Sequence, residues 1–194
     1  MPKRFRPGML GVLLSMIVLP LSYLPAQTEH MPSGTATYFS HDDLMAIMQK
    51  TADQPASDAQ VAVLDVNNSE YHIAVGIAHR SKASANTSGG ASVEHSEVAE
   101  IYYIISGNAV LNTGGTMKDL KDPRPGAPNG PSGPSSSGGE IIGGVSKTVG
   151  PGDVVVIPPN TPHRFTAINS DEIVYVLVRT DPHKVLPVMN LLAR

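Results

Sequence analysis

The chain has 194 residues, of which 41% are hydrophobic, and its formal net charge is -3. This length suffices for one domain with a hydrophobic core and is too short for two ordinary domains. Because the charge shows no basic excess that would neutralise phosphates, nucleic acid is excluded as an expected partner. The chain contains no cysteine, which excludes disulfides and thiolate metal ligands, so a bound metal would need nitrogen and oxygen ligands from His, Asp and Glu.

The N-terminus has the pattern of an export signal. Basic residues lie within the first six positions, and a mainly apolar run follows over residues 9–24. This run is shorter than the ~20 residues that cross a bilayer comfortably, so we expect a signal peptide over residues 1–26, cut near Ala26. The mature protein would be periplasmic or secreted, with no stable membrane span. Leu24 is a poor residue two positions before the cut, which leaves an uncleaved anchor as the alternative.

Residues 27–59 are predicted to form an N-terminal extension with one short helix. Ser40 has the character of an N-cap, and the acidic Asp43 follows three positions later. Apolar residues then recur at helical spacing at Leu44, Ile47 and Met48. This stripe is typical of a helix that packs on a core rather than one that contacts a cofactor.

The pattern changes to alternation with period two in residues 60–182, which predicts an all-β domain. In the segment 71–80, Ile77 and His79 share the more apolar face, and we assign this face to the inside of the domain. Residues 101–105 and 109–111 are predicted to pair as strands joined by a turn at Gly107-Asn108. Further strands are predicted over residues 154–157, which we expect to be buried, 163–167 and 172–179.

Three segments are predicted to lie outside these strands. Residues 82–90 are polar and rich in glycine, which indicates a loop. Residues 114–139 are rich in Gly, Pro and Ser and predict a mobile, solvated loop, with a lid over the site and an interdomain linker as alternatives. Residues 183–194 form an apolar C-terminal tail, which either packs back on the domain as a short helix or contacts a second copy in a homodimer.

Two short segments place ligand-type side chains at strand ends. His95 and Glu100 are expected to end one strand and begin the next, across a tight connection that can direct both inward. The proline-rich turn 158–162 delivers His163 to the start of another strand. Two imidazoles and one carboxylate suit one divalent ion of iron, manganese, zinc, nickel or copper, whose other positions would be open to water or a small-molecule ligand.

At these residues the sequence resembles the cupin superfamily, whose motifs run G-x5-H-x-H-x3,4-E-x6-G and G-x5-P-x-G-x2-H-x3-N. His95, Glu100 and Gly107 match the second half of the first motif. Gly152, Pro158 and His163 match the second motif, in which Asn160 replaces a glycine and Ala167 an asparagine. The resemblance implies a single jelly-roll β-barrel with the metal inside.

The sequence departs from the first motif at one expected ligand. The first histidine of the motif falls at Val93, which cannot bind a metal. His79 is a candidate for the missing ligand, with a water molecule or a purely structural strand histidine as the alternatives. Tyr102 shares the strand face of Glu100, and Phe165 shares that of His163. Both are therefore candidates to line the pocket or to pack in the core.

The resemblance does not select a reaction, because cupins include oxygenases, isomerases, decarboxylases, sugar binders and storage proteins. One hypothesis is a metal-dependent oxygenase or isomerase that acts on a small oxygen-rich substrate. A second is a small-molecule binding or sensing barrel without turnover, with or without metal. A third is a metal-free barrel that stabilises an assembly.

Overall fold

The computed structural model describes residues 36–66, 69–86, 91–121 and 131–192. The chain divides into two units, Met1–Tyr38 and Phe39–Arg194, and the fold described below belongs to the second. The predicted signal peptide, residues 1–26, lies outside the described residues. Within those residues, no helix has the length and apolar character needed to cross a membrane.

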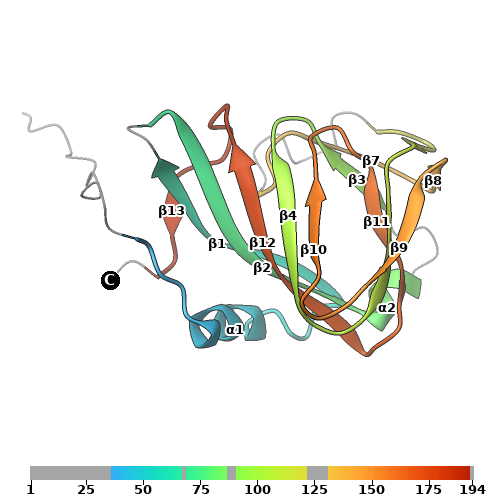
Figure 1. Ribbon diagram of the computed structural model, residues 1–194, viewed down its shortest axis with the longest axis horizontal. Helices are drawn as coiled ribbons and strands as arrows, with labels where there is room; N and C mark the ends of the chain where they lie inside the picture. The colour runs from blue at the N-terminus through green and yellow to red at the C-terminus, as the bar shows by residue number, and fades with distance from the viewer. Residues whose placement is uncertain (1–35, 67–68, 87–90, 122–130, 193–194) are drawn as a thin grey trace, which may run out of the picture. The chain divides into compact units, whose positions relative to one another are not determined.

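Two antiparallel sheets make up the folded unit (Figure 1). The six-stranded sheet has the order β10 (Val154–Ile157), β4 (Ala99–Ser106), β12 (Glu172–Asp181), β2 (Tyr71–Ser81), β1 (Ala56–Val66) and β13 (Met189–Asn190). The five-stranded sheet has the order β7 (Ser135–Gly138), β3 (Ser92–His95), β11 (His163–Ile168), β5 (Ala109–Thr113) and β9 (Val145–Val149). A small ribbon pairs β6 (Thr116–Met117) with β8 (Ile141–Ile142), and the helices are α1 (His41–Gln49) and α2 (Lys82–Asn86).

The order of the strands is that of a jelly roll. Eight strands make up the jelly roll. In one sheet they are hydrogen-bonded in the order β2-β12-β4-β10, and in the other in the order β3-β11-β5-β9. The first strand therefore lies beside the last, and the second beside the second to last, as in a double Greek key. The predicted all-β jelly roll with a short N-terminal helix is confirmed.

Helix α1 forms where the sequence predicts it. The Ser40 side chain caps the helix and accepts a hydrogen bond from the backbone N–H of Asp43 at 3.1 Å. The apolar stripe packs on one face of the six-stranded sheet, in a cluster that contains Leu44, Ile47, Met48, Val61, Ile77 and Val174. This cluster anchors the helix to the outer face of the sheet (Figure 1).

The inward face predicted for residues 71–80 is wrong. Ile77 packs in the cluster under α1, whereas Ala78 belongs to the core between the sheets, together with Tyr102 and Tyr175. Alternation identifies the two faces of a strand but not which one a helix covers. Because α1 supplies an apolar cover on the outside, the more apolar face of β2 points away from the barrel interior, and Arg80 faces its cavity.

The predicted hairpin between residues 101–105 and 109–111 is also wrong. β4 and β5 belong to different sheets, so the chain crosses from one sheet to the other at Gly107. The backbone of Gly107 has φ +82°, and a Cβ placed there would lie 2.0 Å from the carbonyl oxygen of Glu172. Only glycine fits this crossing without displacing the start of β12.

Three smaller expectations differ from the structure. Part of the predicted loop 82–90 is the helix α2, and residues 87–90 lie outside the described residues. β10 is an edge strand on which Val154 and Val156 are exposed rather than buried. The C-terminal tail packs back through the buried Leu186 and the short strand β13, which pairs with β1, instead of forming a helix.

The solvated loop predicted over residues 114–139 is wrong for its second half. Ser135–Gly138 forms β7, which pairs with β3 along its whole length, and Ser132 is buried. The composition correctly indicates little apolar area, but small side chains also allow a close backbone approach. A Cβ on Gly138 would lie 2.6 Å from the Met117 side chain. Residues 122–130 lie outside the described residues.

The crossing at Gly107 leads to a stability prediction with a matched control. Gly107→Ala should lower the free energy of unfolding by about 2 kcal/mol more than Gly114→Ala, because it adds overpacking to backbone strain. Gly114 has a similar φ of +80°, but a Cβ added there would meet nothing within 4 Å. Urea unfolding of both variants measures the difference, and equal losses would show that the contact with Glu172 does not restrict the site.

Candidate metal centre

The fold brings the three motif residues together between the two sheets. His95 ends β3 and His163 begins β11 in the five-stranded sheet, whereas Glu100 lies on β4 in the other sheet. One ligand atom from each residue lies within 4.8 Å of the other two, and all three residues are buried. Each sheet therefore contributes part of the group, and the group closes only when the sheets face each other.

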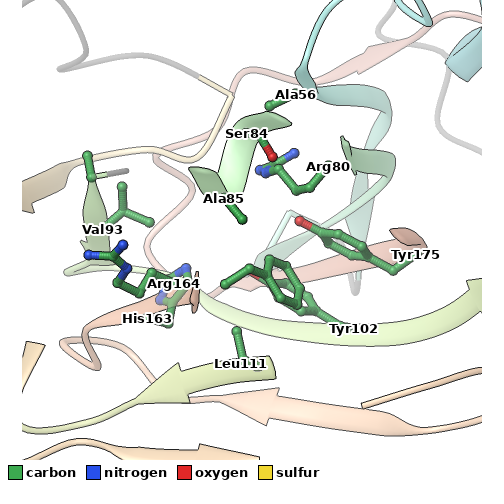
Figure 2. Close-up of a pocket in the computed structure, with 12 residues that line it drawn as sticks. Ala56, Arg80, Ser84, Ala85, Val93, Tyr102, Leu111, His163, Arg164 and Tyr175 are labelled. Carbon is green, nitrogen blue, oxygen red and sulfur yellow. The ribbon is translucent and has the colours of Figure 1, made fainter. Parts of the chain in front are cut away.

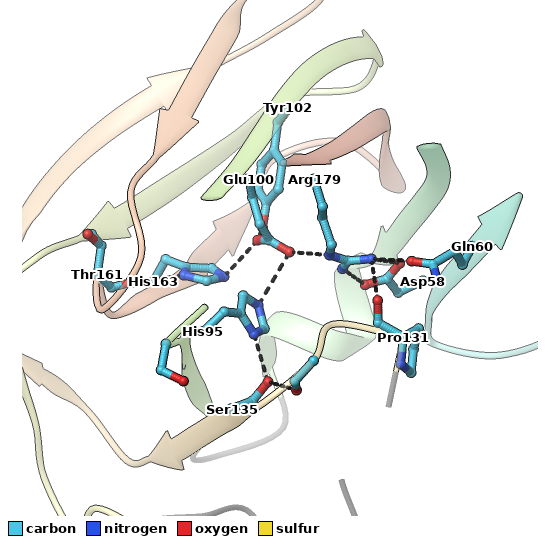
Figure 3. A network of polar contacts seen from close by, with 12 residues as sticks. Asp58, Gln60, His95, Glu100, Tyr102, Pro131, Ser135, Thr161, His163 and Arg179 are labelled. Atoms are coloured by element: carbon cyan, nitrogen blue, oxygen red, sulfur yellow. Dashed lines mark hydrogen bonds and ion pairs between the residues drawn. The ribbon is translucent and has the colours of Figure 1, made fainter. Parts of the chain in front are cut away.

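The carboxylate of Glu100 stands between the two imidazoles (Figure 3). His95 Nε2 lies 3.3 Å from Oε1, and His163 Nε2 lies 3.3 Å from Oε2. The ring centroids of His95 and His163 are 5.4 Å apart. Both histidines thus direct Nε2 toward the Glu100 carboxylate, one to each oxygen.

The partners of the Nδ1 atoms define which ring nitrogens carry hydrogen. His163 Nδ1 lies 3.0 Å from the carbonyl oxygen of Thr161, which can only accept, so Nδ1 donates. His95 Nδ1 lies 2.8 Å from Ser135 Oγ, whose own hydrogen is donated to the carbonyl of Gly133. The Ser135 hydroxyl therefore accepts from His95. When either ring is neutral, its Nε2 is therefore the nitrogen that carries the lone pair.

Burial and charge set the protonation states of the group. Burial lowers the pKa of His95 by more than its hydrogen bond with Glu100 raises it, which favours the neutral ring. Burial would raise the pKa of Glu100, but His163 and His95, which can donate to the carboxylate when their rings are protonated, and the charge of Arg179 hold this pKa well below its usual value. Glu100 is therefore an anion at neutral pH.

Glu100 is held by two further donors. Arg179 Nε donates to Oε1 at 2.9 Å, and the Tyr102 hydroxyl donates to Oε2 at 2.7 Å. Burial and the neighbouring Glu100 raise the pKa of Tyr102 well above its usual value, so the hydroxyl remains protonated. Each carboxylate oxygen uses one lone pair on these donors and keeps another on the histidine side. This buried acceptor set can bind a metal ion.

Arg179 is the functional residue that the sequence reasoning missed. Its side chain is 1% exposed, and besides Glu100 it bonds to the Asp58 carboxylate, to Gln60 Oε1 at 3.4 Å and to the Pro131 carbonyl at 3.1 Å (Figure 3). Tyr175 and Leu177, its alternate neighbours on β12, belong to the core between the sheets. The sequence does contain a signal for Arg179: by period-two alternation, this charged residue falls on the same strand face as apolar core residues.

The structure does not bring His79 to this group. Its Nε2 lies 3.1 Å from the Thr51 carbonyl oxygen, just beyond α1, and its Nδ1 lies 3.5 Å from a Glu172 carboxylate oxygen. His79 lies in step with Ile77, which faces the helix, so the predicted fourth ligand is on the wrong side of β2. The reason is the reversed face assignment.

A cavity of about 200 Å³ opens beside His163 between the sheets (Figure 2). Tyr102 and Phe165, the two predicted pocket residues, both line it. Val93 lines it too, at the position where the motif has its first histidine, and it pairs with His163 across β3 and β11. The cavity therefore borders the side of the group where the motif would place a further ligand.

The turn before His163 explains one departure from the second motif. Asn160 has φ +58°, in the left-handed region where glycine is common and asparagine is the best-tolerated alternative. Its backbone N–H donates to the carbonyl of His95 at 2.8 Å. The turn thus links the segments that carry the two histidines.

The bonds of Arg179 predict a large effect of its removal. Arg179→Gln should lower the free energy of unfolding by about 3–5 kcal/mol, because Glu100 would remain buried without its counter-charge. The double variant Arg179→Gln/Glu100→Gln should recover part of this loss. Urea unfolding of the metal-free proteins measures both effects, with Lys118→Gln, an exposed ion-pair partner of Glu140, as the control for simple loss of charge. If the losses of the two single substitutions simply add in the double variant, Arg179 and Glu100 are not energetically coupled.

No protein-family model matches the sequence, and no curated protein matches it. Among solved structures, a cupin protein from Bacteroides fragilis is 17% identical over 69% of this chain and 85% of its own, with a TM-score of 0.36. A protein of unknown function from Rhizobium leguminosarum is 14% identical over 77% of this chain and 99% of its own, with a TM-score of 0.43.

A structure described as DMSP lyases RdDddP and RnDddQII is 19% identical over 56% of this chain, with a TM-score of 0.32, and this chain covers only 38% of its length. Likeness at these values carries no argument about function. The strand order and the positions of the motif residues carry the assignment of the fold. This jelly roll, in which the ends of its strands deliver both motifs to one point between the sheets, has the fold of the cupin superfamily.

Proposed function

We propose that this protein is an exported metal-binding cupin, which holds one divalent ion on His95, Glu100 and His163 and binds or transforms a small oxygen-rich molecule beside it. The observation that carries the proposal is the convergence of acceptors. Two Nε2 atoms face an ionised carboxylate at 3.3 Å, and the bonds at Nδ1 leave the lone pair of each neutral ring on Nε2. Facing acceptors repel one another unless a cation lies among them.

The donor set fits a divalent first-row metal. Two imidazole nitrogens and one carboxylate suit iron, manganese, zinc, nickel or copper and leave coordination positions open. The contacts of Ser135, Thr161 and Arg179 behind the three ligands hold them in place before the ion arrives. A bound ion would supply a Lewis acid that polarises an oxygen of the ligand.

The residues of the cavity favour chemistry at the metal over proton transfer by the protein. Its titratable lining residues, apart from His163, are two arginines and two tyrosines. Burial raises the pKa of Tyr175 to about 12 and that of Tyr102 well above its usual value, so neither accepts a proton at neutral pH. This observation also supports the second candidate function, a barrel that binds or senses a small molecule without turnover.

The proposed site predicts the metal content of its variants. Protein purified without chelator should carry about one divalent ion per chain, and His163→Ala should lower this content severely, because only two ligands remain. Inductively coupled plasma mass spectrometry on the purified proteins measures the content. His183→Ala, an exposed histidine paired with Glu97, is the matched control and should retain the ion. Full retention in His163→Ala, with a cooperative melt, would contradict the assignment.

Export is proposed from the basic start and apolar run alone. Residues 1–28 fused to a reporter that is active only outside the cytoplasm should direct its export. Replacement of the basic residues Lys3, Arg4 and Arg6 by glutamine should reduce the exported fraction. Reporter activity confined to the cytoplasm for the unchanged segment would remove export from the proposal.

A further inference from the structure

A second cationic group stands in the cavity at a distance from the ligand residues. Arg80, on β2, directs its guanidinium into the cavity beside Ser84 of α2 and close to the hydroxyl end of Tyr175 (Figure 2). Its guanidinium carbon lies 5.9 Å from the centroid of the Tyr175 ring. Because Arg80 is on the six-stranded sheet and His163 on the other, the two residues line the same cavity from opposite sheets.

Among the described residues, the guanidinium of Arg80 has neutral hydrogen-bond partners only. Its Nη1 donates to the carbonyl oxygens of Ser57 and of His79, the latter at 2.8 Å. No described carboxylate lies within ion-pair distance of it, and the Asp58 and Glu100 carboxylates, whose charges act on it, are both bonded to Arg179. An arginine is charged at every physiological pH. Arg80 is thus a largely enclosed cation with no ion-pair partner in the part of the chain that the structure describes.

The rest of the lining strengthens this positive character. No described lining residue is acidic, and Arg164 contributes a second cation, whose Nε is buried without a hydrogen-bond partner. In Figure 2 the Arg164 guanidinium lies beside Val93, on the other side of the cavity from Arg80. A narrow cavity lined by one sign of charge concentrates ligands of the opposite sign.

The cavity also limits the size and shape of its ligand. About 200 Å³ is below the range of roughly 300–1,000 Å³ that holds drug-sized ligands. Leu111, Phe165 and the ring of Tyr102 also line it, so part of its wall is apolar. These features fit a short molecule with an anionic group for Arg80, a small apolar part and an oxygen for the His163 side of the cavity.

We propose that the cavity binds a small organic acid, whose carboxylate pairs with Arg80 and whose other end presents an oxygen toward the His95, Glu100 and His163 group. This inference rests on the proposed metal-binding function and narrows its ligand class. The planar guanidinium matches a carboxylate through two parallel hydrogen bonds, which a neutral amide or alcohol cannot reproduce. Arg80 is the residue that selects acids over neutral molecules of the same length.

Succinate is a suitable probe, because one carboxylate can pair with Arg80 and the other presents oxygen to the metal group. Its diamide, succinamide, has the same length without the charges. Isothermal titration of the purified protein with its metal should show binding of succinate and at least about ten-fold weaker binding of succinamide, as expected when a charge-assisted hydrogen bond is lost. Equal binding of the two probes would overturn the proposal.

Variants at Arg80 test whether this residue binds the carboxylate of succinate. Arg80→Gln should weaken succinate binding at least about ten-fold while its metal content stays at the level of the unchanged protein, because Arg80 does not contact the ligand residues. Arg80→Lys should retain part of the affinity through its charge. Lys118→Gln, an exposed lysine outside the cavity, should bind as the unchanged protein does. Unchanged succinate affinity in a folded Arg80→Gln would place recognition elsewhere.

Two further comparisons test whether the site selects organic acids and whether that site is independent of the metal site. Sulfate at equal ionic strength should compete weakly, and competition equal to that of succinate would overturn the assignment to organic acids. If Arg80→Gln does not melt cooperatively, Arg80→Lys and the comparison of succinate with succinamide decide. Protein that holds no metal yet binds succinate in an Arg80-dependent way would refute the metal site alone. Metal that is bound without selection for succinate would refute the organic-acid site alone.

Discussion

The buried ion pair between Arg179 and Glu100 is the interaction on which the candidate site depends. Both side chains are almost fully buried; Arg179 compensates the charge of Glu100, and Glu100 and Asp58 together compensate that of Arg179. The pair keeps Glu100 ionised inside the protein and fixes the plane of its carboxylate. Without this pair, the carboxylate that faces His95 and His163 would have no defined position. Asp58, Gln60 and the Pro131 carbonyl complete the shell around the guanidinium.

The same interaction joins parts of the chain that are remote in sequence. Arg179 belongs to β12, Glu100 to β4 and Asp58 to β1, three strands of the same sheet. The segment 131–135 contributes from the other side, through the Pro131 carbonyl and the Ser135 hydroxyl. The Gly, Pro and Ser-rich region therefore has a structural role at the site, since Ser135 determines which nitrogen of His95 carries hydrogen.

Sequence reasoning located His95, Glu100 and His163 because strand ends and rigid turns fix the backbone position from which each of these side chains extends. Such positions depend on local chemistry, as the Asn160 turn illustrates. The predictions were wrong where the inward face of a strand depends on which other element packs against it. His79 was placed inside because its strand face is apolar, yet α1 covers that face from outside. Arg179 was missed because an arginine in a buried strand signals function only once its partners are known.

The jelly-roll order also has a consequence for the time at which the site can form. Ser81 at the end of β2 pairs with Glu172 at the start of β12, so the central strands of the larger sheet come from opposite ends of the domain. Such non-local pairing makes folding slow, because the intervening chain must first be closed into a loop. His163 lies on β11 and Arg179 on β12, so both come after His95 and Glu100 in the chain. The ligand set therefore cannot form until β11 and β12 have paired with the earlier strands, and a metal ion would bind only after the barrel has closed.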